Sequence, residues 1–149
     1  MSDVLTPAQR RRNMQAIRGR DTAPEMIVRR MIHGMGFRYR LHRRDLPGCP
    51  DIVLPRLRRA ILVHGCFWHQ HPGCVYATRP APRPAFWAAK LKGNADRDKR
   101  VTRALRRLGW RILVVWECQT RDAPRLERRI RRFLGSPSTG EDPPRRKRA

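Results

Sequence analysis

The stretch LPGCPDIVLPRLRRAILVHG, residues 46–65, decides the fold of this chain. A turn rich in Pro and Gly leads into a short apolar run, and a second apolar run begins after the basic residues near position 58. Two apolar runs separated by a polar turn predict a pair of antiparallel strands. We therefore expect a hairpin that turns near Arg56 to Arg59, with Asp51 opening one strand and His64 ending the other.

Two helices and a strand are predicted upstream of this hairpin. The segment TPAQRRRNMQAIRG (6–19) has Pro near its start and Gly at its end, which predicts a short basic helix. In DTAPEMIVRRMIHGMG (21–36), the residues Ile27, Met31 and Met35 recur at intervals of four, as on the apolar face of a helix. The segment FRYRLHR (37–43) alternates apolar and charged residues, which predicts a half-buried strand.

Further elements are predicted downstream. A Pro-rich loop at 78–84 precedes a long helical segment at 85–109, and WRILVVWE (110–117) is the most continuous apolar strand. The last predicted helix, at 123–135, carries Leu126, Ile130 and Phe133 on one face. Helices on both sides of a strand cluster predict an α/β fold, with a three-layer core and a mixed central sheet.

The domain organisation expected from these elements is simple. We assign residues 1–135 to one domain, whose basic N-terminal helix spans 6–20. The remaining segment, 136–149, is polar, Pro-rich and basic, and it is expected to be a disordered tail.

The charge of the chain is extreme. Its 149 residues include 35 Lys and Arg against 12 Asp and Glu, a formal net charge of +23. Such a balance is typical of proteins that bind nucleic acid, and the planar guanidinium of Arg pairs well with phosphate. The same balance would also fit a genome whose composition favours Arg codons, or a structural protein like those of the ribosome.

The compartment is expected to be the cytoplasm, where the DNA lies. No run of about 18 apolar residues predicts a membrane span, and the N-terminal residues lack the apolar core of a secretory signal. The four cysteines are therefore expected to be metal ligands or structural thiols rather than disulfides.

A cluster of metal-ligating residue types follows the hairpin, in VHGCFWHQHPGC (63–74). Cys66, His71 and Cys74 are close enough for one tetrahedral metal, and Cys118, after the core strand, can supply the fourth ligand. Sulfur and imidazole suit Zn²⁺, and a closed set of four ligands is typical of a structural site. The alternative is that Cys118 is a buried thiol and the other spacing incidental. Cys49, remote in sequence, is interpreted as structural.

The remaining histidines of this cluster, His64 and His69, would lie near Asp51 across the hairpin. A carboxylate and a main-chain oxygen of the 62–64 segment can hold Mg²⁺, which polarises a phosphate and acidifies its bound water. A nearby histidine can pass protons near neutral pH. Alternatives stay open: Asp51 as a turn residue after proline, His64 as a core histidine, and Glu25 as part of a capping box at a helix start.

Five motifs together resemble those of a known family. The stretches RRRNMQAIRGRDTAPE, LPGCPDIV, HGCFWHQHPGC, FWAAKLKGNADRD and LGWRILVVWEC occur in the family's order over residues 8 to 134. On these motifs the chain resembles the very-short-patch (Vsr-type) mismatch repair endonucleases, which nick DNA at T·G mismatches. The resemblance implies a restriction-endonuclease-like core and a nick 5′ to the T of a mismatch left by 5-methylcytosine deamination. It also implies a functional link to a cytosine-5 methyltransferase and a repair polymerase.

The resemblance further implies roles for individual residues. Asp51 and the main-chain oxygen of Val63 would hold Mg²⁺. His69, assisted by His64, would act as general base, with Glu25 near the water molecules of the metal. Three further groups are implied: a structural Zn²⁺ on Cys66, His71, Cys74 and Cys118, an aromatic wedge that intercalates in DNA on Phe67, Trp68 and Trp87, and DNA contacts from Met14, Arg18 and Arg20.

The chain departs from the family's pattern in two places. Val63 stands where the best-known members carry a hydroxyl residue, which leaves its main-chain oxygen as the possible ligand. The interval between His71 and Cys74 is one residue longer than in some members, and its Pro-Gly turn can absorb the difference. Judged from the residues alone, Trp68 would be core packing and Trp87 part of the apolar face of a helix.

Three functions are therefore carried forward: a Mg²⁺-dependent mismatch nickase, a non-catalytic zinc-bearing nucleic-acid-binding protein, and a nuclease of a restriction system. Asp51 and His69 favour an enzyme, because a binding protein needs no such pair beside a zinc loop. No heptad seam or long apolar surface helix is predicted, so we expect a monomer.

Overall fold

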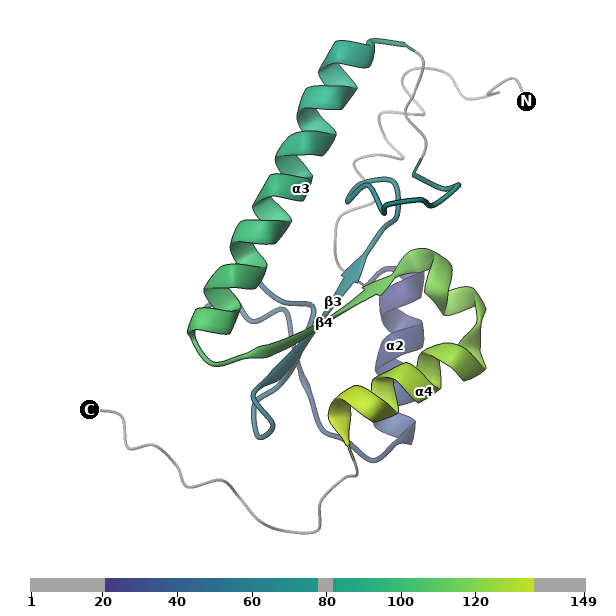
Figure 1. The fold of residues 1–149 in the computed structure, drawn as a ribbon. Helices are drawn as coiled ribbons and strands as arrows, with labels where there is room; N and C mark the ends of the chain where they lie inside the picture. The colour runs from purple at the N-terminus through teal and green to yellow at the C-terminus, as the bar shows by residue number, and fades with distance from the viewer. Residues whose placement is uncertain (1–20, 78–81, 136–149) are drawn as a thin grey trace.

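The computed structural model describes residues 21–77 and 82–135 (Figure 1). The predicted helix at 6–20, with Met14, Arg18 and Arg20, and the predicted tail at 136–149 lie outside the described residues. In chain order the described elements are α2 (Ala23–Gly34), β1 (Arg40–Leu41), β2 (Ile52–Leu54), β3 (Arg59–His64), α3 (Pro84–Arg107), β4 (Arg111–Trp116), the 3-10 helix η1 (Glu117–Arg121) and α4 (Ala123–Leu134). None of these helices has the length and apolar character needed to cross a membrane.

The four strands form one mixed sheet in the order β1-β2-β3-β4. β2 and β3 are antiparallel, with Ile52 opposite Ile61, and the chain turns between them at residues 55–58, so the predicted hairpin is confirmed. β4 runs parallel to β3, with Trp116 opposite His64, and α3 lies in the crossover connection between them. Because parallel strands end at the same edge of a sheet, the segments that follow His64 and Trp116 meet there.

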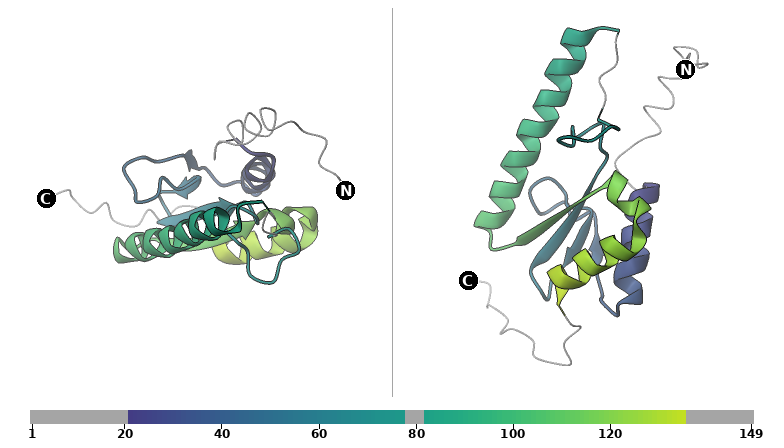
Figure 2. Two further views of the ribbon diagram at one scale, coloured as in Figure 1. Left: turned by 90° about the horizontal axis from the view of Figure 1, so that it is seen from above. Right: turned by 45° about the vertical axis from the view of Figure 1, so that its right-hand side comes forward.

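The sheet lies between two layers of helix, since alternate residues of a strand point to opposite faces. One core cluster joins α2 and α4 to a first set of strand residues, which includes Ile52, Leu54, Ile61 and Val115. A second cluster joins α3 to Val53, Ala60 and Ile112. Figures 1 and 2 show the same arrangement, with α3 on one side of the strands and α2 and α4 on the other. The predicted α/β fold with a mixed sheet is confirmed.

The buried face of α2 differs in part from the predicted one, although Met35, directly after the helix, is buried as predicted. Val28 and Ile32 are fully buried, whereas Ile27 and Met31 are only partly buried. The difference arises because the buried face of α2 also contains Glu25 and Arg29. A prediction from apolar residues alone leaves such charged residues out.

The predicted strand at 37–43 pairs in the sheet only at Arg40 and Leu41. The N–H of Phe37 instead donates to the carbonyl of Ile32 and so closes the end of α2. Phe37 remains a core residue as expected, but it is held there by the helix end rather than by a strand ladder.

Candidate active site and metal centre

Four side chains that could hold one metal ion meet at the edge where β3 and β4 end. Cys66, His71 and Cys74 belong to the loop after β3, and Cys118 lies in η1, directly after β4. Their ligand atoms all lie within 4.8 Å of one another. The His71 Nδ1 atom is 3.4 Å from the Cys118 sulfur and 3.8 Å from the Cys66 sulfur. The parallel register therefore assembles the set that the spacing predicted.

The separations within this group fit a tetrahedral ion. Metal–sulfur bonds of about 2.3 Å and metal–nitrogen bonds of about 2.0 Å place tetrahedral corners about 3.5 Å apart. The two His71 distances lie on either side of that value. Burial raises the pKa of the Cys66 thiol to about 12, so a thiolate at this depth needs a cation beside it.

An aromatic cluster extends from this loop to the start of α3. Phe67 and Trp68 follow the first cysteine ligand, and Trp87 lies in the first turn of α3. The ring centroids are 5.0 Å apart for Phe67–Trp68, 5.7 Å for Phe67–Trp87 and 6.1 Å for Trp68–Trp87. All three side chains are partly buried, and none belongs to either core cluster of the described residues. They pack on one another at the surface, so core packing does not account for them.

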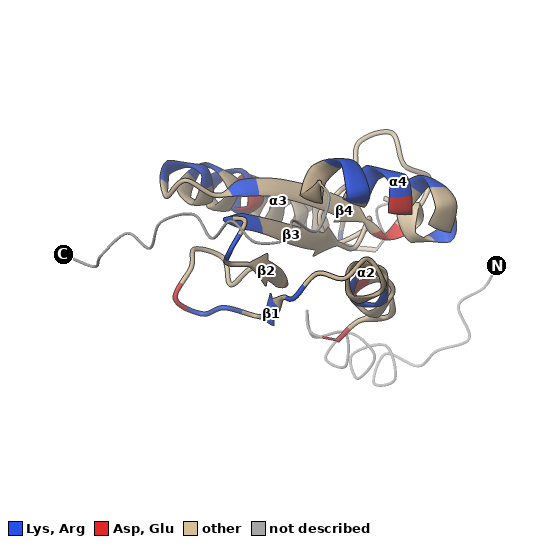
Figure 3. Cartoon of the chain, turned by 90° about the horizontal axis from the view of Figure 1, so that it is seen from below, with Lys and Arg blue, Asp and Glu red and all other residues tan. Residues whose placement is uncertain are grey.

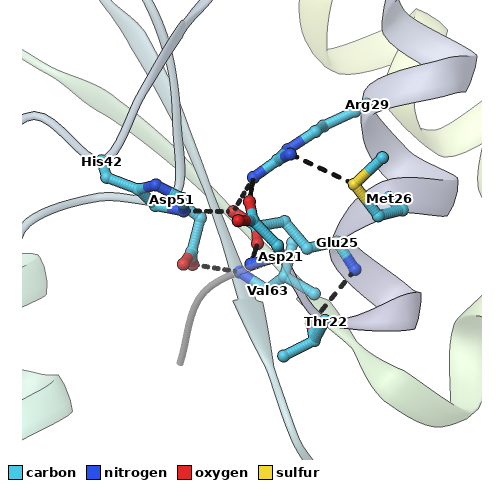
Figure 4. Close-up of polar contacts among 8 residues, drawn as sticks. All are labelled: Asp21, Thr22, Glu25, Met26, Arg29, His42, Asp51 and Val63. Atoms are coloured by element: carbon cyan, nitrogen blue, oxygen red, sulfur yellow. Dashed lines mark hydrogen bonds and ion pairs between the residues drawn. The ribbon is translucent and has the colours of Figure 1, made fainter. Parts of the chain in front are cut away.

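Asp51 lies directly before β2 and reaches across to β3 (Figure 4). Its carboxylate accepts a hydrogen bond of 2.9 Å from the main-chain N–H of Val63. The N–H and C=O of one strand residue point to the same side, so the Val63 carbonyl also faces Asp51 rather than β4. Burial raises the pKa of Asp51 to about 6, while the Val63 hydrogen bond opposes that rise. The hairpin thus places a carboxylate and a main-chain oxygen together.

The two spare histidines lie beside this carboxylate and meet α3. The rings of His64 and His69 stack with their centroids 3.9 Å apart. The Nδ1 atom of His69 is 2.6 Å from a carboxylate oxygen of Asp98, on α3. Burial, reinforced by His69, lowers the pKa of His64 to about 4, so His64 is uncharged at neutral pH. A carboxylate on one imidazole nitrogen orients the ring and leaves the other nitrogen for proton exchange.

Glu25 is 1% exposed and lies in a polar network (Figure 4). One carboxylate oxygen is 2.7 Å from His42 Nε2 and 3.2 Å from the Arg29 guanidinium. The Thr22 hydroxyl accepts from the Glu25 N–H, so the predicted helix cap is confirmed. The reciprocal half of the capping box is different, because the second Glu25 oxygen accepts from the N–H of Asp21 rather than of Thr22. Glu25 therefore both starts a helix and joins α2 to the loop that carries His42.

Asp51 and the two histidines line one cavity of about 640 Å³, and Glu25 is not among its lining residues. Its wall includes the predicted catalytic residues of the hairpin and loop together with Asp98 and His42. Two cations, Arg44 and Arg97, also line it. Cys49, expected to be purely structural, lies in the same wall. The cavity therefore combines carboxylates, imidazoles and guanidinium groups, the chemistry needed to bind and cleave a phosphodiester.

Comparison with known proteins decides the family. The model of the family described as DNA mismatch endonuclease Vsr matches residues 2–74, which contain both the hairpin and the loop with Cys66, His71 and Cys74. The DNA mismatch endonuclease Vsr of Escherichia coli (strain K12) is 44% identical over 126 residues, which cover 85% of this chain and 80% of that protein. The chain belongs to the Vsr family of DNA mismatch endonucleases.

Other Vsr-family relatives are named as nicking enzymes. The type II nicking enzyme V.XorIIP of Xanthomonas oryzae pv. oryzae is 48% identical over 134 residues, 90% of this chain and 98% of that protein. The type II nicking enzyme V.NmeAIP of Neisseria meningitidis is 34% identical over 134 residues, 90% of this chain and 95% of that protein. Membership of the Vsr family makes the chain a DNA endonuclease with a nuclease fold, and the resemblance found in the sequence motifs is confirmed.

The Vsr-family cavity also contains residues that the sequence did not single out. The fold brings Asp51, His64 and His69 together as expected. The carboxylate partner of His69, however, is Asp98, which lies on α3. A signal existed, because Asp98 is one of two acidic residues on a strongly basic helix. His42 falls in a predicted strand, and nothing in its sequence neighbours indicates that it reaches Glu25.

Proposed function

We propose that this Vsr-family chain nicks double-stranded DNA 5′ to the T of T·G mismatches, which arise by deamination of 5-methylcytosine, and so initiates very short patch repair. The nick would leave a 5′-phosphate and a 3′-hydroxyl. The observation that carries the proposal is one cavity in which Asp51, the Val63 main chain and the His69–Asp98 pair face one another, next to a loop that carries part of a half-buried aromatic cluster. A non-catalytic binding protein would have no use for this cavity.

Asp51 and the carbonyl oxygen of Val63 would hold Mg²⁺, a cation that prefers oxygen ligands and retains sites for water and phosphate. When bound, the ion would polarise the scissile phosphate and lower the pKa of a bound water. Val63 would contribute only main-chain atoms, so the missing hydroxyl leaves this ligand set intact. With a pKa of about 6, Asp51 is mostly ionised at neutral pH, and a neighbouring cation favours the ionised form further.

His69 would take the proton from the attacking water. Asp98 accepts the hydrogen of Nδ1, which leaves Nε2 as the nitrogen that gains the proton. The Asp98 carboxylate then stabilises the imidazolium that forms. His64, neutral because its pKa is lowered to about 4, would support His69 by stacking without adding a like charge. Glu25, held by His42 and Arg29, would lie near the water molecules of the metal.

The ion held by the four-residue group is proposed to be structural Zn²⁺, because three sulfurs and one imidazole suit that metal and leave no open position. These ligands are Cys66, His71, Cys74 and Cys118. Zn²⁺ would fasten the loop after β3 to the end of β4, and so fix the loop that carries both His69 and the first two aromatic residues.

The aromatic cluster would serve as a wedge between base steps. Insertion costs a few kcal/mol per step, and less at a pair that is already weakly stacked and paired, so a T·G mismatch would admit Phe67, Trp68 and Trp87 more easily than a matched pair. The loop that would hold Zn²⁺ places Trp68 directly before His69 in the chain. Sensing and cutting would therefore be coupled by the rigidity of one short segment.

Charge and partners follow from the DNA substrate. Arg44 and Arg97 would offset the charge of a phosphate that enters beside Asp51 and Asp98. The proposed contacts of Met14, Arg18 and Arg20 would grip the duplex outside the cavity. We further propose that the chain acts as a monomer on nucleoid DNA in the cytoplasm, with a functional link to a cytosine-5 methyltransferase and a repair polymerase.

The test is cleavage of a labelled T·G duplex in Mg²⁺ by the wild type, Asp51→Ala and His69→Ala. We expect a single nick on the 5′ side of the T, and a loss of at least about 100-fold in rate for each variant. Asp45→Ala is the matched control, because Asp45 is an exposed carboxylate of the neighbouring loop outside the cavity wall. Unchanged cutting by Asp51→Ala would refute the metal assignment, and binding without cutting would favour the non-catalytic binder. Cutting of matched DNA would favour a restriction-type nuclease.

A further inference from the structure

The outward face of α4 carries a row of arginines that the cavity does not use. The helix holds five Arg and one Glu in 12 residues. Arg125, Arg128 and Arg132 recur at i, i+3 and i+7 and so share one helical face. At about 100° per residue, this face lies opposite the buried residues Leu126, Ile130 and Leu134. Figure 3 shows the basic residues along the helix and its single acidic one.

The other two arginines of α4 are occupied within the protein. Arg129 donates to the Val114 carbonyl and to the Gln119 side chain. Arg131 pairs with Glu127, which is the one carboxylate of the helix. Among the described residues, the three row arginines are paired with no carboxylate. Like charges at these spacings repel one another, so an anion outside the fold would relieve the row.

The row begins at the edge of the sheet that holds the cavity. α4 follows η1, which carries Cys118, and η1 follows the end of β4 opposite His64. From there α4 runs back along the sheet, in the layer away from α3 (Figure 1). The row spans about 10 Å at 1.5 Å per residue. A duplex whose mismatch lies at the cavity extends beyond it, and the row begins at the same edge of the sheet as the cavity.

We propose that the arginine row, Arg125, Arg128 and Arg132, binds the phosphate backbone of double-stranded DNA outside the mismatch. The proposal rests on the proposed function only in taking duplex DNA as the substrate. The guanidinium fork matches phosphate oxygens, and a helix face without aromatic or amide side chains offers no means of reading bases. The row would therefore add affinity for any duplex without adding sequence preference.

The test is the salt dependence of binding to a long labelled duplex without a mismatch, in the absence of Mg²⁺, for the triple variant Arg125→Gln, Arg128→Gln, Arg132→Gln. Loss of three phosphate contacts should make the slope of log K against log salt shallower by about 2.7. Between about 50 and 200 mM salt, the affinity of the variant should then fall about 40-fold less than that of the wild type. Its single-turnover nicking at saturating concentration should be unchanged.

Two matched variants separate a local contact from net charge and from misfolding. Replacing the exposed arginines at 30, 38 and 56 with Gln also removes three positive charges, which lie in and after the C-terminal half of α2 and in the hairpin turn. This control should leave the salt slope unchanged. Replacing the row by Lys keeps the positive charges and should retain the slope. An unchanged slope in the Gln row, or an equal change in the control triple, would overturn the proposal. Since binding is read without cleavage, a protein that fails to nick still gives a decisive result.

Discussion

Replacing Asp51 with Asn should stabilise the magnesium-free protein at neutral pH while abolishing cleavage. Burial raises the pKa of Asp51 from an ordinary 3.8 to about 6, against the opposing hydrogen bond from Val63. At 1.36 kcal/mol per pH unit, that difference corresponds to about 3 kcal/mol of unfavourable free energy when the carboxylate is ionised in the fold. Asn has the same shape, keeps an oxygen for the Val63 N–H and carries no charge to desolvate.

The stabilisation should depend on pH in a defined direction. Between about pH 4 and 6 the folded Asp51 keeps a proton that the unfolded chain has lost. Because the folded state binds more protons in this window, the unfolding free energy of the wild type falls as pH rises through it. Below the window both states are protonated and the contribution is fully present. Above it the contribution is lost, so the advantage of Asp51→Asn should be largest there.

Urea unfolding of the wild type and Asp51→Asn, in zinc-containing buffer without magnesium, measures this difference. Near pH 8 the variant should be more stable by about 1–3 kcal/mol, and near pH 4 the two proteins should agree within error. Added Mg²⁺ should stabilise the wild type and not the variant, because only the ionised carboxylate would hold the ion. Equal or lower stability of Asp51→Asn near pH 8 would refute the argument that a buried charge at this residue is costly.

Three further predictions follow from single contacts. Asp98→Asn removes the charged partner 2.6 Å from His69 Nδ1 and should slow single-turnover nicking by about 10²–10⁴, with little change in DNA affinity. Asp96→Asn on the same helix is the control, and a loss of nicking rate below about tenfold in Asp98→Asn would contradict the role of Asp98 as partner of His69. Metal analysis should find about one zinc per wild-type chain, lost together with folding in Cys118→Ser; a folded variant that retains zinc would exclude residue 118 as a ligand. Gly48→Ala should lower the free energy of unfolding by about 1–3 kcal/mol, because its φ is +70° and a Cβ would lie 2.4 Å from a Val101 methyl. Gly73→Ala, also at +70° but in open space, should lower it less. An equal loss of stability for the two variants in thermal unfolding would show that the contact with Val101 does not matter.

The sequence predicted those parts of the site that depend on the hairpin and on short spacing. Asp51 and His64 flank one turn, so antiparallel pairing alone brings their strands together. The candidate ligands Cys66, His71 and Cys74 lie in one loop. Cys118 lies near them because it follows the most apolar strand, which is parallel to β3. In each case local periodicity and one strand pairing were sufficient.

Other parts of the site depend on tertiary geometry that no local pattern encodes. Asp98 contacts His69 because of where α3 lies on the face of the sheet. That position depends on tertiary packing, such as that of Leu105 against Val53 and Ala60. Glu25 and Arg29 were missed as buried residues because the inner face of α2 includes this ion pair beside its apolar residues, and a pattern of apolar residues does not reveal it. That Trp68 and Trp87 pack on each other outside both core clusters could not be read from residue type, and the proposed wedge role came from the family resemblance alone.

The most direct test of the central claim, that the aromatic wedge and the cavity act together on a mismatch, is single-turnover nicking of two labelled duplexes that differ only in one pair, T·G or T·A. In Mg²⁺ we predict a nick 5′ to the T of the T·G duplex at a rate at least about 100-fold above that of the T·A duplex, since wedge insertion is cheaper at the weakened pair. Trp68→Ala should lower the T·G rate and leave the T·A rate nearly unchanged. Equal rates on the two duplexes would contradict the claim.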